Sequence, residues 1–160
     1  MHNALTDWAG DRDDRWSTTG YTFILSEGTI AWATQKQRTV ALSSTEAEYM
    51  ALTETSKHAQ WTVSLLQQLS FNLDLPIDIF TDSEGTQAIA ANNVYHKRTK
   101  HIDIKYHYIR EKIMDGTVCV NEVGSKNNLA DVFTKPITRD QHQILTSRIG
   151  LVDDPIEGDC

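Results

Sequence analysis

The chain has 160 residues, of which 39% are hydrophobic and 23% are charged, and this composition is typical of a single folded domain. Its net charge of −7 at pH 7 argues mildly against a nucleic acid as a partner, although one segment is strongly basic. No apolar run reaches the length of a membrane-spanning helix, and Cys119 and Cys160 lack the spacing of metal ligands, so we expect neither a membrane protein nor a zinc site.

Residues 20–35 predict a β-hairpin. Two β-rich runs lie on either side of Glu27 and Gly28, a pair of residues that suits a tight turn. Alternation from Tyr21 to Leu25 indicates a strand with two different faces.

Residues 43–69 predict a long helix. Ser43 and Glu46 have the spacing of a capping box at its start. Apolar side chains recur at helical spacing along it, which indicates an apolar face. These side chains are Met50, Trp61, Leu65 and Leu69.

The second half of the chain alternates strands with helices. In chain order we expect a buried strand at 77–82, a helix at 83–93, a helix at 99–116 that ends at Gly116, a strand at 117–123, a helical turn at 127–135 and a helix from Thr138. This order predicts a mixed α/β layer fold with a partly antiparallel sheet. We expect one domain at 1–151 and an acidic, disordered tail at 152–160.

Three carboxylates lie at the ends or starts of expected elements. Glu48 is near the start of the long helix, Asp82 ends a buried strand, and Asp131 follows the last strand. Carboxylates that converge repel one another, and a divalent cation such as Mg²⁺ or Mn²⁺ commonly resolves that repulsion. The simpler alternative is that they favour a helix start, cap a helix and face solvent, respectively. Spacing alone leaves both interpretations open.

Several motifs in fixed order resemble one known family. "VALSSTEAEYMAL", "FTDSEGTQAIA", "RTKHIDIKYHYIREKI" and "NLADVFTKP" are similar to the ribonuclease H domain of copia-type LTR retrotransposon Pol polyproteins. "DWAGDRDDRWSTTGYTF" resembles the opening of that domain. The resemblance covers nearly the whole chain.

The resemblance implies a ribonuclease H fold, with a central five-stranded mixed sheet flanked by helices. It also implies metal-dependent endonucleolytic cleavage of RNA in RNA–DNA hybrids during reverse transcription, with two Mg²⁺ ions (or Mn²⁺) held by four carboxylates. Matched by motif, Glu48, Asp82 and Asp131 are three of these catalytic and metal-binding acids, whereas Glu46 should face elsewhere on the helix. The implied partners are an RNA–DNA hybrid and the reverse transcriptase portion of the same polyprotein. The implied location is the cytoplasm, in virus-like particles, with the nucleus as an alternative and no signal peptide.

The fourth acid of the family pattern is missing. Alignment on "DWAG" puts Leu5 where the first catalytic acid belongs and makes Asp7 the second acid of the pattern. The residues before Leu5 lack the apolar run of a central strand, so we expect an incomplete first strand. Asp7 is a possible substitute, but it would lie about 6.6 Å farther along the same face of a strand.

The segment from residue 95 to 112 is strongly basic within an acidic chain. Cationic side chains at helical spacing suit contacts with phosphates, whereas an ordinary solvated helix face is the alternative. An A-like hybrid would be recognised by its shape and its 2′-hydroxyl groups. The candidate nucleic-acid contacts are Arg98, Lys100, His101, Lys105 and Lys112.

Two functions therefore remain open. The first is a metal-dependent ribonuclease that acts on RNA–DNA hybrids, supported by Glu48, Asp82 and Asp131. The second is a non-catalytic relic or domesticated domain that only binds nucleic acid, supported by Leu5.

Overall fold

The computed structural model of the chain describes residues 2–7, 16–41, 43–82 and 100–151, with side chains except at 2–7 and 100–103. The helix predicted at 83–93, the candidate contact Arg98 and the tail at 152–160 lie outside the described residues.

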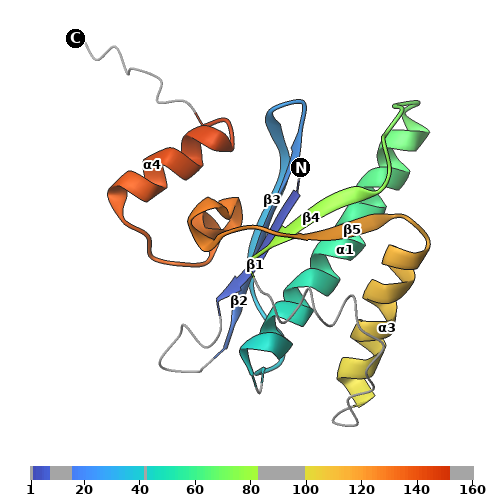
Figure 1. The fold of residues 1–160 in the computed structure, drawn as a ribbon, viewed down its shortest axis with the longest axis horizontal. Helices are drawn as coiled ribbons and strands as arrows, with labels where there is room; N and C mark the ends of the chain where they lie inside the picture. The colour runs from blue at the N-terminus through green and yellow to red at the C-terminus, as the bar shows by residue number, and fades with distance from the viewer. Residues whose placement is uncertain (1, 8–15, 42, 83–99, 152–160) are drawn as a thin grey trace.

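A five-stranded mixed sheet forms the centre of the structure, as the resemblance predicted (Figure 1). Its strands are β1 (His2–Asp7), β2 (Thr18–Leu25), β3 (Gly28–Lys36), β4 (Ile77–Thr81) and β5 (Val118–Glu122). They lie in the order β3-β2-β1-β4-β5, in which β2 is antiparallel to its two neighbours and β1, β4 and β5 are parallel. The predicted mixed α/β class is therefore confirmed.

β1 occupies the middle of this sheet. It pairs with β2 along its full length of 6 residues, and with β4 at His2 and Asn3. The residues before Leu5 thus form part of a central strand, although few of them are apolar. Backbone hydrogen bonds define a strand whatever its side chains, which is why residues with a weak apolar pattern, expected to leave the first strand incomplete, still pair here.

Helices cover both faces of the sheet. α1 (Ser44–Gln68) and α3 (Lys100–Met114) pack together on one side, whereas the 3₁₀ helix η2 (Leu129–Phe133) and α4 (Arg139–Arg148) lie on the other (Figure 1). A second short 3₁₀ helix, η1 (Ser125–Asn127), precedes η2. None of the described helices is long and apolar enough to cross a membrane.

The main core lies between the sheet and the helices α1 and α3. Phe23, Leu52, Ile79 and Ile109 are almost completely buried in it. Burial of each such side chain contributes about 1.5–3 kcal/mol to folding. A smaller core on the other side joins η2 to α4 through Leu129, Leu145 and Ile149.

The turn of the predicted hairpin lies one residue earlier than expected. Ser26 and Glu27 occupy its two central positions, and both have positive φ, 50° and 68°. A turn with positive φ at both central residues has a twist that matches the twist of the two strands it connects. Gly28 begins β3 instead of forming the turn.

α1 begins where the capping box predicted. Ser43 Oγ accepts a hydrogen bond from Glu46 N at 3.1 Å, which satisfies one of the free amides in the first turn. The final helix likewise has Thr138 as its N-cap, with Oγ1 accepting a hydrogen bond from Gln141 N at 3.4 Å. The predicted end of α3 is also confirmed, since Gly116 has φ of 74° just beyond it.

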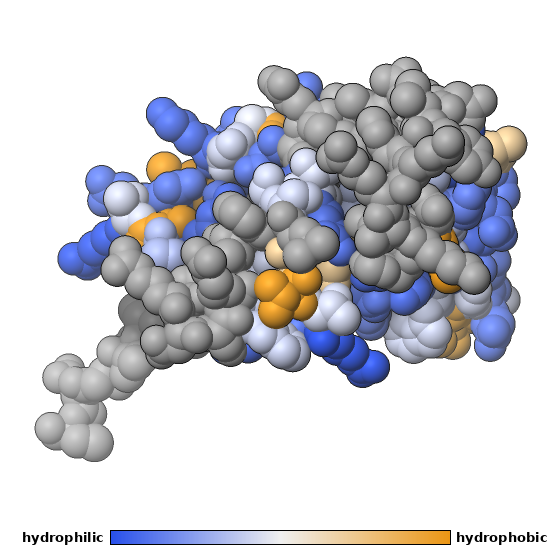
Figure 2. All heavy atoms as spheres, turned by 90° about the horizontal axis from the view of Figure 1, so that it is seen from below, coloured by the Kyte–Doolittle hydropathy of each residue, from blue (hydrophilic) through white to orange (hydrophobic). Residues whose placement is uncertain are grey.

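The apolar stripe predicted for α1 is wrong in its second half. Trp61 is 61% exposed and Leu69 is 59% exposed. Smaller side chains, including Ala59 and Val63, form the face that packs into the core. The helical period was read correctly, but the phase of the buried face depends on which side the sheet occupies. In Figure 2 the described residues on the face shown are mostly polar, with small apolar patches between them.

Candidate functional site

Two of the predicted acids meet at one edge of the sheet. β1 and β4 are parallel, so both end at this edge, and Asp82 follows the last residue of β4. Asp131 lies in η2, which packs on β1 and β2. Lys135 Nζ lies 3.6 Å from Asp82 Oδ2 and 3.2 Å from Asp131 Oδ1. The two carboxylates therefore share one ammonium group, a partner that sequence patterns did not identify.

Contacts with the hairpin hold η2 in place. Asn128 caps η2 by accepting a hydrogen bond from Ala130 N at 3.1 Å, and Thr34 Oγ1 in β3 donates to Phe133 O at 2.7 Å. η2 also crosses β2 at Gly20, where a Cβ atom would lie 2.5 Å from Thr134 Cγ2 and 3.0 Å from Phe133 Cβ. This close approach fixes the position of Asp131 because η2 has no room to shift toward the sheet.

Gly20→Ala is expected to lower the free energy of unfolding by about 1–3 kcal/mol, because the added methyl group overpacks the contact with η2. Urea unfolding measures this loss. Gly124→Ala is the matched control, since a Cβ there meets nothing within 4 Å and the residue has φ of −61°. Equal stability of the two variants would contradict the close approach.

Asp131 is a buried acid in a charged environment. Burial raises the pKa of its carboxyl group, the Lys135 ammonium opposes that rise, and the Asp82 carboxylate adds to it. Asp131 Oδ1 is buried, and the Lys135 ammonium at 3.2 Å lowers the pKa of the carboxyl group but is too poorly aligned to satisfy this oxygen fully. An unsatisfied buried acceptor costs about 1–3 kcal/mol, which a cation in contact with it would offset. These two carboxylates therefore fit a divalent ion, whose preferred ligands are such oxygens.

Glu48 lies in the second turn of α1 and is partly buried. Among the described side chains, no three that could ligate a metal are grouped closely enough to hold an ion, so Glu48 is not joined to Asp82 and Asp131 in this structure. Glu46 is buried, and its carboxylate raises the pKa of Lys105 of α3.

Gln37 fastens the start of α1, a role that the sequence patterns did not identify. Its Nε2 donates hydrogen bonds to Thr19 Oγ1 at 2.9 Å and to Ala47 O at 2.8 Å. Ala47 directly precedes Glu48, so this buried amide ties the helical turn that carries Glu48 to β2. No sequence signal could have identified it, because its burial is decided by the fold and it stands in a polar run.

The strand register puts position 5 beside the two acids. Leu5 pairs with Gly20, where η2 crosses the sheet. On the other side Asn3 pairs with Phe80, and the same parallel register continued by two residues puts Leu5 level with Asp82. Asp7 pairs with Thr18, one side-chain repeat farther along β1. The position that the family pattern reserves for an acid thus lies on β1, between β4, which leads to Asp82, and β2, on which the 3₁₀ helix of Asp131 packs.

The predicted cationic face of α3 is only partly available. Lys112 is buried, and its ammonium pairs with Asp115 Oδ2 at 2.8 Å, so its charge is engaged within α3 and its neighbouring turn. Lys105 is half-buried; burial lowers its pKa, while Glu46 and Glu54 raise it. The backbones of Lys100 and His101 begin α3, but their side chains are outside the described set.

The Lys112–Asp115 pair makes stability depend on pH. Hydrogen bonds from Lys112 and Thr117 lower the pKa of Asp115 in the folded chain. This stabilisation is present above the unfolded pKa of about 3.9 and is lost as pH falls through the lower folded value. We expect the free energy of unfolding, measured with urea, to fall less between pH 7 and pH 3 for Asp115→Asn than for the natural chain. Asp74→Asn, at an exposed position, is the control, and its free energy of unfolding should fall as much as that of the natural chain. Equal falls in all three proteins would contradict the role of the pair.

Comparison with known proteins gives the same family as the motifs. The chain is 44% identical to the "Retrovirus-related Pol polyprotein from transposon RE1" of Arabidopsis thaliana over 149 residues, which are 93% of this chain and 10% of that protein. It is 41% identical over 145 residues to the Pol polyprotein from transposon TNT 1-94 of Nicotiana tabacum, covering 91% of this chain and 11% of the relative. No model of a known protein family matches.

Solved structures show the same fold at low sequence identity. LC11-RNase H1, solved in complex with an RNA/DNA hybrid, has a TM-score of 0.59 and 16% identity, covering 84% of this chain and 94% of that one. RNase H1 from the archaeon Halobacterium salinarum has a TM-score of 0.56 and 16% identity, covering 83% of this chain and 93% of the other.

The fold and the edge at which Asp82 and Asp131 meet define a ribonuclease H-like domain. Within that class, the chain is homologous to copia-type retrotransposon Pol polyproteins, as its motifs predicted. It spans about a tenth of the length of these relatives, and 10% of the polyprotein from transposon RE1.

Proposed function

We propose that this chain is a ribonuclease H domain that cleaves the RNA strand of RNA–DNA hybrids in reverse transcription with the help of a divalent metal ion. The convergence of Asp82 and Asp131 on one cation carries the proposal. The RNA/DNA hybrid bound to LC11-RNase H1 and the similarity to Pol polyproteins support the substrate. The reverse transcriptase portion of the same polyprotein is the proposed partner.

Asp82 and Asp131 would hold the metal, Mg²⁺ or Mn²⁺, with Glu48 as a further ligand from α1. In such a site the bound metal supplies an activated water and stabilises the leaving oxygen of a phosphate ester. The protein contributes the placement of these acids: η2 and Gly20 hold Asp131, and β4 ends at Asp82. Arg98, Lys100, His101 and Lys105 would contact phosphates, which position a hybrid without reading its sequence.

Leu5 favours a second candidate, a domain that binds a hybrid without cutting it. A leucine contributes no ligand at the position beside Gly20 and Asp82, and loss of one ligand weakens both the affinity and the placement of a metal. The natural chain would thus cleave slowly under the first proposal and would not cleave at all under this second one.

The test is cleavage of a labelled RNA–DNA hybrid in Mg²⁺ or Mn²⁺ by the natural chain, Leu5→Asp and Asp82→Asn. Slow cleavage that Asp82→Asn abolishes supports the enzyme. Hybrid binding without cleavage by either the natural chain or Leu5→Asp supports the second candidate.

A further inference from the structure

Lys135 is placed at the acids by the backbone of η2. Its amide N donates a hydrogen bond to Asp131 O at 3.0 Å, directly after the C-cap Thr134. The side chain then turns toward the edge of the sheet, where its ammonium contacts one oxygen from each of Asp82 and Asp131. Because both the main chain and the charged group of Lys135 are held by this site, it differs from an unattached surface lysine.

The ammonium is held loosely compared with the acids around it. The side chain of Lys135 is 31% exposed, whereas those of Asp82 and Asp131 are 13% and 5% exposed. Distances of 3.6 and 3.2 Å exceed the 2.7–2.9 Å typical of charge-assisted hydrogen bonds. A lysine with a flexible four-carbon stem can leave such a position for solvent without moving the backbone.

A divalent ion and this ammonium compete for the same oxygens. Mg²⁺ approaches carboxylate oxygens to about 2.1 Å, and two cations that close together repel each other strongly in a partly buried site. Without either cation, the two acids repel each other, and Asp131 Oδ1 has no hydrogen bond to offset its burial.

The geometry points to Lys135 as a displaceable internal counter-cation, which holds Asp82 and Asp131 together before metal binds and leaves when a divalent ion arrives. This inference rests on the proposed metal site. Lys135 is thus a positioning residue that lowers the affinity for the first ion while keeping the site assembled.

The test is Mn²⁺ binding to the full chain, measured by electron paramagnetic resonance of free Mn²⁺, for the natural chain, Lys135→Met and Lys57→Met. Lys57→Met removes the same charge from a surface pair with Glu54 on α1. Lys135→Met is expected to bind Mn²⁺ about tenfold more tightly or better, because the competing charge is gone. Lys57→Met should match the natural chain.

Thermal unfolding supplies a second readout. In EDTA, Lys135→Met should unfold at a lower temperature than the natural chain. Mn²⁺ should remove this difference in unfolding temperature. Unchanged or weaker Mn²⁺ binding by Lys135→Met would overturn the role of Lys135 as a counter-cation. If Mn²⁺ affinity is unchanged and hybrid binding is weaker, Lys135 is a phosphate contact instead. Absence of Mn²⁺ binding by these three chains and by Leu5→Asp, measured in the same way, would instead reject the metal site itself and this inference with it.

Discussion

Leu5→Asp is expected to raise the rate of RNA cleavage in an RNA–DNA hybrid by about a hundredfold or more, because it adds a carboxylate where the site lacks one. Position 5 pairs with Gly20, and its register with β4 leads to Asp82. Residues directly opposite in an antiparallel pair share a face, so the new carboxylate would lie on the face that η2 covers at Gly20. The measurement is the single-turnover rate on a labelled hybrid at saturating Mg²⁺.

Leu5→Asn is the matched control for this gain. Asparagine has nearly the shape of aspartate but carries no charge, so it should leave the rate close to that of the natural chain. Equal gains from both variants would show that relief of a leucine contact, and not a new ligand, is responsible. If the natural chain is already fast and Asp7→Asn stops it, Asp7 replaces the missing acid and the role given to Leu5 is wrong.

Asp131→Asn in the Leu5→Asp background is expected to lower the cleavage rate by at least about a hundredfold, since it removes a metal ligand that η2 holds in place. The same change should leave the free energy of unfolding in EDTA equal or higher. Burial raises the pKa of Asp131, so its charged form is less favourable in the folded chain than in the unfolded one at neutral pH. Activity should therefore fall without any loss of stability.

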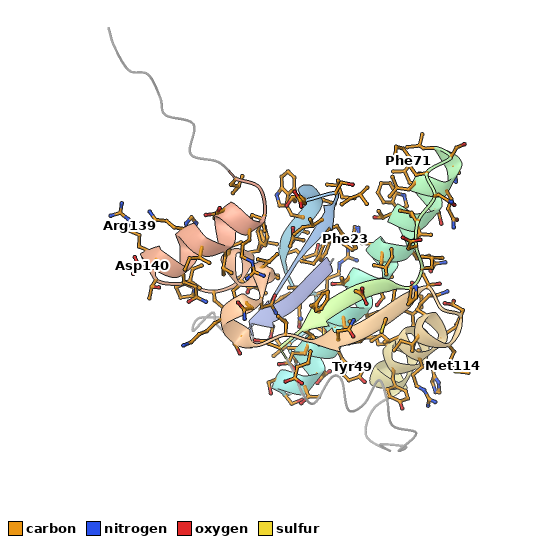
Figure 3. All side chains as sticks on the ribbon, turned by 45° about the horizontal axis from the view of Figure 1, so that its top comes forward. Phe23, Tyr49, Phe71, Met114, Arg139 and Asp140 are labelled. Atoms are coloured by element: carbon orange, nitrogen blue, oxygen red, sulfur yellow. The ribbon has the colours of Figure 1, made fainter. Side chains whose placement is uncertain are left out.

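Asp140→Asn is the control for Asp131→Asn. Asp140 lies on α4, away from the sheet, and is exposed (Figure 3). Its substitution should leave the cleavage rate unchanged and lower stability by no more than about 0.3–1 kcal/mol, because Asp140 lies in the first turn of α4. A large loss of stability in Asp131→Asn would instead identify Asp131 as a structural residue, and loss of activity would then follow from unfolding.

Local patterns predicted the elements whose causes are local. The caps at Ser43 and Thr138 depend on atoms three residues apart, and the end of α3 depends on one glycine, Gly116. The motifs around Asp82 and Asp131 likewise identified two acids that the structure brings together. These features could be predicted because the residues that produce them are neighbours in the chain or match a known family pattern.

Other features depend on which elements pack together. The exposure of Trp61 and the place of Lys135 beside Asp82 are set by elements distant in the chain. β1 is central despite its weak hydrophobic pattern, because the strand order is β3-β2-β1-β4-β5.

Helical period, caps and acid motifs are thus properties of the sequence, since each is encoded within a few residues. The sharing of one ammonium by Asp82 and Asp131, and the room left at Gly20 for η2, exist only after the strands have paired. The physical reason is that charge and packing energies depend on distance in space, which strand order sets and sequence spacing does not.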